Sequence, residues 1–305
     1  MREKTQDEAW LSTPDGQPRG YIESERLTEL WLHTGTNCNL SCPFCLEGSK
    51  PGDDRIQFLT LEDAQPFIDE ALEMGVEKFS FTGGEPFVNP HFMEILDRTL
   101  THRPCLVLTN GTEPLRNRMA EVIELRQKPN PLAFRVSLDH PDPVKHDESR
   151  GKGNFRMALR TLGLLHAEGF GVSIARLMEP EEDSQAIDGS YAPLLAEAGL
   201  PTDLPIVKFP DFLRPGAIAD VPDVTENCMK SYTTAEQRAQ YMCSFNRMIV
   251  KKNGRPGVYA CTLVDDDEQF DLGNTLRESF EIRIRLKHHR CYSCFAYGSS
   301  CSEGT

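Results

Sequence analysis

The chain of 305 residues, 39% of them apolar, is long enough for one full domain and a small appendage. Its 33 basic and 47 acidic residues give a net charge of −14, which repels nucleic-acid phosphates and anionic lipid headgroups, so we expect no nucleic-acid partner. The N-terminus has no apolar signal segment and no run is long enough to span a bilayer, which predicts a cytoplasmic protein without a membrane partner. In that compartment ten cysteines favour metal binding over disulfides.

Apolar strands alternate with amphipathic helices from residue 27 to residue 213, after residues 1–26, which we expect to form a loosely ordered lead-in. This alternation predicts an α/β fold with a parallel sheet of six strands and right-handed crossovers. Strands are expected at 28–34, from 79 to the glycine pair at 83 and 84, and at 105–109, 134–139, 170–178 and 204–209. Helices are expected at about 60–75, 90–100, 114–127, 154–168 and 191–198.

Three cysteines follow the first predicted strand within eight residues, at Cys38, Cys42 and Cys45. Three thiolates on one loop can bind one polynuclear centre from a single side. Structural zinc almost always takes four protein ligands, so three ligands favour an iron–sulfur cluster with one iron left open. The alternatives are a zinc knuckle completed by a distant residue such as His33, or three buried thiols.

The stretch CNLSCPFC resembles the Cys-x3-Cys-x2-Cys motif of the radical S-adenosylmethionine (SAM) enzymes, with Phe44 as the usual aromatic. The segment FSFTGGEPF resembles that family's GGEP motif, which holds the SAM amino group. The resemblance implies a partial (βα)6 TIM-like barrel and a 4Fe-4S cluster whose open iron chelates SAM. It also implies reductive cleavage of SAM to a 5′-deoxyadenosyl radical that abstracts a substrate hydrogen, and a one-electron donor such as flavodoxin or ferredoxin. The motif residues assigned to cofactor binding are Phe44, Gly83, Gly84, Glu85 and Pro86.

Polar residues lie at the carboxyl ends of several predicted strands, which form the rim where α/β folds bind ligands. Periodicity alone allows a turn onset at Ser137 and Asp139, whereas the resemblance implies contacts with SAM. The stretch HDESRGKGNF resembles the family segment in which an arginine reaches the SAM carboxylate, and Arg150 is the matching residue. Arg176, near the end of the next predicted strand, is a second candidate for this contact, with a solvated surface position as the alternative. The predicted rim residues that bind the cofactor are Asn110, Ser137, Asp139, Arg150 and Arg176.

The C-terminal part is predicted as a linker and helix at 214–240 and a small α+β domain at 241–305. It should contain a hairpin around Asn253 and Gly254, then a helix at about 275–289 capped by Asn274. Cysteines flank these elements and can hold a fully ligated second cluster, with structural zinc as the alternative. The arrangement resembles the SPASM/twitch auxiliary-cluster extension, which implies a second 4Fe-4S cluster. The candidate ligands are Cys243, Cys261, Cys291 and Cys294, with Cys301 as a fifth thiol for four places.

The sequence leaves the substrate open. Auxiliary-cluster enzymes often modify a peptide or protein, and the cysteine spacing is also close to that of a twitch-type dehydrogenase of a small metabolite. In either case the second cluster would assist substrate oxidation or binding. A metal-binding protein without turnover, holding iron–sulfur clusters or zinc, is the competing hypothesis.

Overall fold

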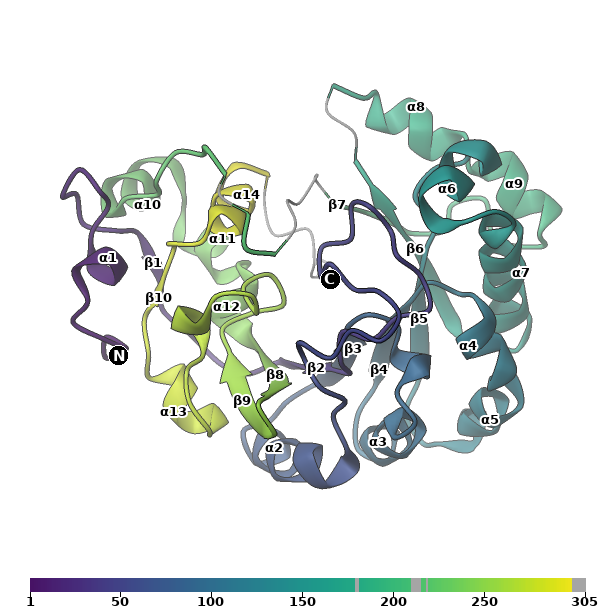
Figure 1. The fold of residues 1–305 in the computed structure, drawn as a ribbon, viewed down its shortest axis with the longest axis horizontal. Coiled ribbons are helices and arrows are strands. Elements are labelled where there is room, and N and C mark those ends of the chain that lie inside the picture. Colours follow the sequence, from purple (N-terminus) through teal and green to yellow (C-terminus); the bar gives the residue numbers. More distant parts are fainter. Residues whose placement is uncertain (179–180, 210–214, 218, 298–305) are drawn as a thin grey trace.

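The computed structural model describes residues 1–178, 181–209, 215–217 and 219–297. Its centre is an eight-stranded sheet in the order β7-β6-β5-β4-β3-β2-β8-β9 (Figure 1). Strands β2 to β7 are neighbours in chain order and pair in parallel, which confirms the six predicted parallel strands. Their bounds are β2 Glu29–His33, β3 Lys78–Thr82, β4 Cys105–Thr109, β5 Leu132–Ser137, β6 Gly171–Leu177 and β7 Ile206–Phe209.

Helices cover the outer side of this curved sheet (Figure 1). Their apolar faces and the strands share one buried core, in which Phe79, Phe92 and Phe134 are fully buried. Thr60 and Asp63 form a capping box at the start of α2, the first crossover helix, which confirms the helix predicted from about residue 60. The helices between β2 and β7 are α2 Leu61–Glu73, η1 Pro86–Val88, α3 Phe92–Leu100, α4 Glu113–Asn117, α5 Met119–Glu124, η2 Leu125–Gln127, α6 Pro143–Arg150, α7 Asn154–Ala167, α8 Ser184–Gly189 and α9 Ala192–Glu197.

The structure differs from the sequence-based expectations at several elements within the barrel. The helix expected at 114–127 breaks at Arg118, whose φ of −105° and ψ of 12° are not helical, so that α4, α5 and η2 replace it. The fourth strand runs two residues earlier than expected, which leaves Asp139 in the loop after β5. Helix α6 was not predicted, because its single buried residue, His146, gives no apolar stripe.

The C-terminal hairpin extends the barrel sheet. Strand β8, Asn246–Lys252, pairs in parallel with β2, and β9, Arg255–Tyr259, pairs antiparallel with β8. The turn at Asn253 and Gly254, with φ of 52° and 76°, confirms the predicted hairpin turn. Strands from both sides of the linker predicted at 214–240 therefore belong to one sheet. The predicted domain boundaries themselves stay a prediction.

The expected helix at 275–289 is wrong. Helix α13 is only Leu276–Phe280 and is capped by Thr275, not Asn274. The chain then forms β10, Ile284–Arg285, and a new helix α14, His289–Tyr297, which carries Cys291 and Cys294. The pairing of β10 with β1, Tyr21–Ile22, interrupts the expected helix, and this contact joins segments more than 250 residues apart.

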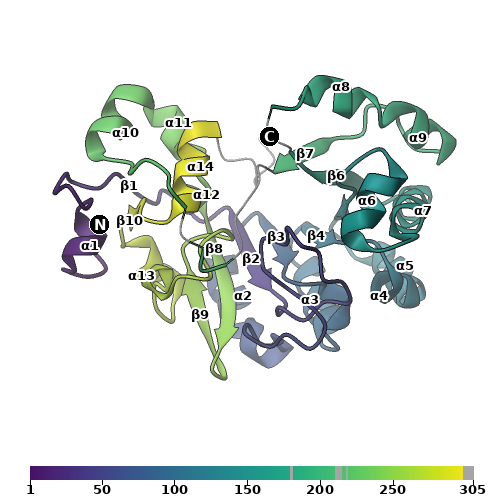
Figure 2. The same ribbon diagram turned by 45° about the horizontal axis from the view of Figure 1, so that its top comes forward.

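The N-terminal segment packs on this C-terminal part. Trp10, in α1 Glu8–Leu11, is fully buried and its ring centroid lies 5.2 Å from that of Phe270. The remaining helices are α10 Glu226–Tyr232, α11 Ala235–Ala239, α12 Met242–Phe245 and η3 Glu268–Phe270. Helices α10, α11, α12 and α14 gather at the end of the sheet opposite α6 to α9 (Figure 2). Within the described part of the chain, no helix has both the length and the apolarity needed to cross a bilayer.

Candidate active site

The loop between β2 and α2 brings the first three cysteines to the carboxyl ends of the parallel strands. Cys38, Cys42 and Cys45 all line one cavity of about 200 Å³. Backbone hydrogen bonds hold the loop. The N–H of Cys45 donates to the carbonyl of Cys42 at 3.1 Å, and that of Gly48 to the carbonyl of Cys45 at 2.9 Å. The structure thus gathers the three thiols on one cavity, as a shared metal centre requires.

Hydrogen-bond donors surround the first of these thiols. The Sγ of Cys38 accepts from the backbone N–H of Leu40 at 3.4 Å, and Nδ2 of Asn110 lies 3.9 Å away. Burial raises the pKa of the Cys38 thiol to about 12. A thiolate at this position therefore needs a cation beside it, and metal coordination supplies one by deprotonating the thiol. The donor set of three clustered cysteines fits a 4Fe-4S cluster with one open iron.

The paired glycines line the same cavity and also support the cysteine loop. The N–H of Gly84 donates to the carbonyl of Gly35 at 2.8 Å. A Cβ on Gly84 would lie 2.4 Å from the carbonyl oxygen of Asn37, and one on Gly83 would lie 2.6 Å from that of Gly35. The absent side chains thus permit a close approach between two protein backbones. A contact of the two glycines with SAM, which the resemblance implies, stays a prediction.

Glu85 does not line the cavity. It is buried behind it, where its carboxylate accepts from the backbone N–H of Asn110 at 2.8 Å and of Phe87 at 3.3 Å. The hydroxyl of Thr109 lies 2.9 and 3.0 Å from its two oxygens. Burial raises the pKa of Glu85 to about 7, although these donors favour the ionised form. Glu85 therefore joins the ends of β3 and β4, and Pro86 begins η1 beside it. A direct contact of either residue with SAM stays a prediction.

Replacing Glu85 by glutamine should destabilise the fold. The amide NH2 would face N–H and O–H groups that now donate to an oxygen, which leaves at least one buried donor unsatisfied. We expect a loss of about 1–3 kcal/mol in the free energy of unfolding, measured by urea denaturation. Glu148→Gln, at an exposed position of α6, is the matched control and should change stability by less than about 0.5 kcal/mol. Equal stability of the two variants would contradict the bracing role of Glu85.

The remaining predicted rim residues all line the cavity: Phe44, Asn110, Ser137, Asp139, Arg150 and Arg176. The two arginines already have acidic partners. Arg150 forms an ion pair with Asp139, and its guanidinium carbon lies 5.6 Å from the ring centroid of Phe44.

Arg176 is fully buried and contacts Glu182 and Asp188, each at 2.7 Å. The alternative of a solvated surface residue is therefore wrong for Arg176, which reaches the cavity as part of an ion-pair network. Arg150, paired with a single carboxylate, is the better placed of the two arginines to share its charge with a bound anion.

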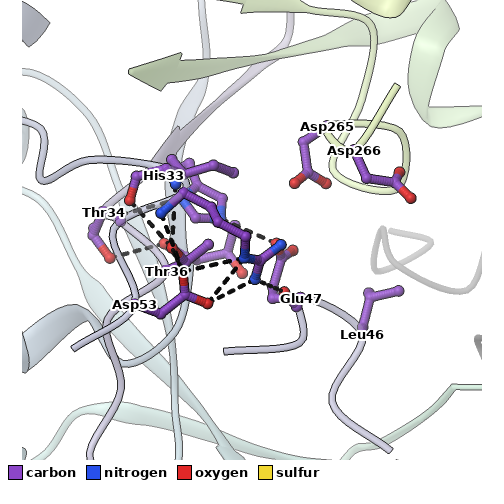
Figure 3. Close-up of polar contacts among 12 residues, drawn as sticks. His33, Thr34, Thr36, Leu46, Glu47, Asp53, Asp265 and Asp266 are labelled. Carbon is purple, nitrogen blue, oxygen red and sulfur yellow. Dashed lines mark hydrogen bonds and ion pairs between the residues drawn. The ribbon is translucent and has the colours of Figure 1, made fainter. Parts of the chain in front are cut away.

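The structure also reveals a buried polar cluster next to the cysteine loop that the sequence did not predict as a unit. The ligand atoms of His33, Glu47 and Asp265 lie within 4.8 Å of one another (Figure 3). The N–H of Gly35 donates to Nδ1 of His33 at 3.1 Å, so Nε2 carries the ring proton and faces Glu47 at 3.2 Å. With both ring nitrogens engaged, His33 is not positioned to complete a zinc site with the cysteines. Only tertiary contact unites these residues, since Asp265 is more than 200 residues from Glu47.

Arg290 connects this region to the C-terminal cysteines. It is buried, and its guanidinium donates to the carbonyls of Leu46 and Leu263, each at 3.0 Å. These carbonyls follow Cys45 by one residue and Cys261 by two, and Arg290 itself precedes Cys291. One side chain therefore joins the cysteine loop, the segment after the hairpin and helix α14.

Four C-terminal cysteines, Cys243, Cys261, Cys291 and Cys294, belong to a second buried cluster of side chains, and Cys228 of α10 also packs against it. Burial raises the pKa of Cys291 well above its ordinary value, and the neighbouring Cys261 and Cys243 thiols add to this rise. Burial raises the pKa of Tyr241, and negative charge on Cys294, Cys243 and Cys291 adds to this rise. The thiols of Cys243, Cys261, Cys291 and Cys294 are therefore brought together from α12, the end of the hairpin and α14. Cys301 lies outside the described residues.

Comparison with known proteins gives the family. The sequence model of the radical SAM superfamily matches residues 32–189, and the chain belongs to this superfamily of enzymes, which use a 4Fe-4S cluster and SAM. The mycofactocin maturase MftC of Mycolicibacterium smegmatis is 32% identical over 205 residues, covering 67% of this chain and 47% of that protein. GTP 3′,8-cyclase of Haemophilus influenzae is 32% identical over 136 residues, covering 43% and 39%. The chain thus spans less than half of these relatives.

A solved structure shows the same fold over most of the chain. SuiB of Streptococcus suis, bound to its precursor peptide SuiA, matches with a TM-score of 0.58 and 15% identity over 89% of this chain and 67% of that one. Together with the superfamily match, this confirms the expected fold class, a partial barrel of α/β type.

Proposed function

We propose that SAM binds in the cavity at the carboxyl ends of β2 to β6 and that Cys38, Cys42 and Cys45 hold the 4Fe-4S cluster beside it. The observation that carries this assignment is the convergence of three cysteines, the glycine pair and an arginine on one cavity. When bound, the cluster supplies an electron that cleaves SAM and generates a 5′-deoxyadenosyl radical. A one-electron donor such as flavodoxin or ferredoxin would reduce the cluster.

The residues of the chain position SAM and shield the reaction. Gly83 and Gly84 line the cavity, so their backbone groups can meet the SAM amino group, and their lack of side chains lets the cysteine loop pack against them. Arg150, held by Asp139, faces the position of a ligand carboxylate. Leu40, Phe44 and Leu108 line the same space and exclude water from it. Ser137 and Asn110 offer polar contacts to the ribose or adenine.

The C-terminal cysteines support a second, fully ligated 4Fe-4S cluster. Cys243, Cys261, Cys291 and Cys294 provide four thiolates, which closes a cluster, whereas the N-terminal loop provides three. A closed cluster has no iron for SAM, so its role is to accept an electron from the substrate or to help bind it. The bridge formed by Arg290 keeps this site next to the first one.

A peptide is the substrate class that the relatives favour. The match to MftC, a maturase by name, extends over more of this chain than the match to GTP 3′,8-cyclase, and SuiB was solved with a precursor peptide. The purified protein should be incubated with SAM, dithionite and short peptides encoded beside its gene. We expect a change in peptide mass together with 5′-deoxyadenosine. Turnover of a nucleotide or sugar derivative with no change in any peptide would favour the small-metabolite alternative.

A variant that lacks Cys291 and Cys294 should distinguish the roles of the two clusters. Cys291→Ala with Cys294→Ala should lose about half of the iron, as expected when one of two equal clusters is missing. SAM cleavage should persist while product formation stops, because the first site is intact. Iron and sulfide analysis with product assays tests this, and Cys228→Ala, in α10, is the control that should keep all the iron. Full iron content in the double variant would overturn the ligand assignment.

A further inference from the structure

Arg247, on β8, is a fully buried arginine whose hydrogen-bond partners are all neutral. Its guanidinium donates to the carbonyls of Cys243 at 2.9 Å, Asn246 at 2.6 Å and Ser279 at 3.0 Å. It also donates to the hydroxyls of Ser279 at 3.1 Å and Ser24 at 2.5 Å. Among the residues that the structure describes, no carboxylate forms an ion pair with it. The N–H groups of Arg247 therefore have hydrogen-bond acceptors, but no carboxylate among the described residues balances its positive charge.

Three other buried arginines of this protein have acidic partners. Arg176 contacts two carboxylates, Arg285 contacts Glu3 at 2.6 Å, and Arg19 contacts Asp223 at 2.7 Å. Burial of an unpaired charge costs several kcal/mol or more, which is why buried charges are normally paired or bound to an ion. The ring of Phe280, whose centroid lies 4.2 Å from the guanidinium carbon, compensates only part of this cost. The fold around Arg247 thus lacks an anion.

The residues beside Arg247 that can supply negative charge are cysteines. Arg247 donates to the carbonyl of Cys243. Burial lowers the pKa of Arg247, and negative charge on Cys243 and Cys261, which metal coordination would produce, opposes that effect. Four thiolates outweigh the positive charge of the inorganic core of a 4Fe-4S cluster, so the whole centre is negative and becomes more negative on reduction. A centre of this kind has the charge that Arg247 requires.

We propose that Arg247 is the buried counter-charge of the second cluster and raises its reduction potential. This inference rests on the auxiliary cluster proposed above. A fixed cation in a low-dielectric interior stabilises the more negative, reduced state over the oxidised one. The cluster would then accept an electron from the substrate more readily than without Arg247. The structural alternative is that Arg247 only joins Ser24, Cys243 and Ser279 by hydrogen bonds.

Three variants separate charge from hydrogen bonding. Arg247→Met removes the charge and keeps the length, and Arg247→Lys keeps the charge with fewer hydrogen bonds. Ser279→Ala removes one hydroxyl partner and leaves the charge in place. All three are made in the full chain with Cys38, Cys42 and Cys45 changed to alanine, so that the second cluster is observed alone. The potential is measured by titration with dithionite and followed by electron paramagnetic resonance, after iron and sulfide analysis.

We expect Arg247→Met to shift the reduction equilibrium at least tenfold toward the oxidised cluster, which for one electron is about 59 mV. Arg247→Lys and Ser279→Ala should stay close to the parent. An unchanged potential in Arg247→Met with full iron, or an equal shift in Ser279→Ala, would overturn the proposal. If Arg247→Met binds no cluster, Arg247→Lys becomes the deciding variant. Iron content and reduction potential equal to those of the parent in Arg247→Lys would support charge compensation. Loss of the cluster in both variants would overturn the proposal. A parent without iron would instead overturn the auxiliary cluster itself.

Discussion

Changing Cys38, Cys42 and Cys45 together to alanine should remove about four irons per chain and abolish 5′-deoxyadenosine formation. The three thiols line the cavity in which we place SAM, and they are the only cysteines that line it among the residues that the structure describes. The expected effect is therefore a complete loss of SAM cleavage with the fold retained. Iron and sulfide analysis, with detection of 5′-deoxyadenosine by mass spectrometry, measures both results.

Cys105→Ala is the matched control for this loss. Cys105 is buried at the start of β4, and its thiol lies 3.3 Å from the hydroxyl of Thr99, away from both cysteine groups. The control should keep its iron and its SAM cleavage. SAM cleavage that persists in the triple variant would show that the cysteine loop does not hold the reactive cluster.

Gly84→Ala should also disrupt the first cluster. The added Cβ would lie 2.4 Å from the carbonyl oxygen and 2.7 Å from the carbonyl carbon of Asn37, the residue before Cys38. Backbone cannot move away as a flexible side chain can, so we expect a loss of about 3 kcal/mol in unfolding free energy. The displaced loop should lose iron along with SAM affinity, as measured by iron analysis and calorimetry.

Gly189→Ala is the control for the change in residue type. Gly189 ends α8, is exposed, and has nothing within 4 Å of the position of an added Cβ. Its substitution should leave iron content and SAM affinity unchanged. Full iron with weakened SAM binding in Gly84→Ala would instead mean that the glycine makes room for SAM rather than for the loop.

The sequence predicted the parts of the fold that depend on local pattern. The six parallel strands were found because each is a short apolar run between turn residues, and the hairpin because Asn253 and Gly254 favour its turn. The cysteine loop was found because its spacing is specific. The helix expected at 275–289 failed because the pairing of Ile284 with Ile22 outweighs local helical preference, and no local pattern reveals such a partner.

The candidate site was predicted in its composition but not in its contacts. The family resemblance placed Arg150 at the rim and the end of a predicted strand placed Arg176 there, and the structure adds the carboxylates that hold them. The hydrogen bonds of Glu85 to Thr109 and Asn110, which place its carboxylate behind the cavity wall, were not foreseen, and its expected contact with SAM stays a prediction. The cluster of His33, Glu47 and Asp265 was missed for a similar reason, since its members meet only when the hairpin packs beside β2.

Reductive SAM cleavage by the reconstituted protein is the most direct test of the central claim. The chain is reconstituted anaerobically with iron and sulfide, then supplied with SAM and dithionite, and 5′-deoxyadenosine and methionine are quantified. We predict equal amounts of both products, formed by the unaltered protein and absent from the variant that lacks Cys38, Cys42 and Cys45. A protein that holds its full iron content and yields neither product would contradict the claim and favour a metal-binding protein without turnover.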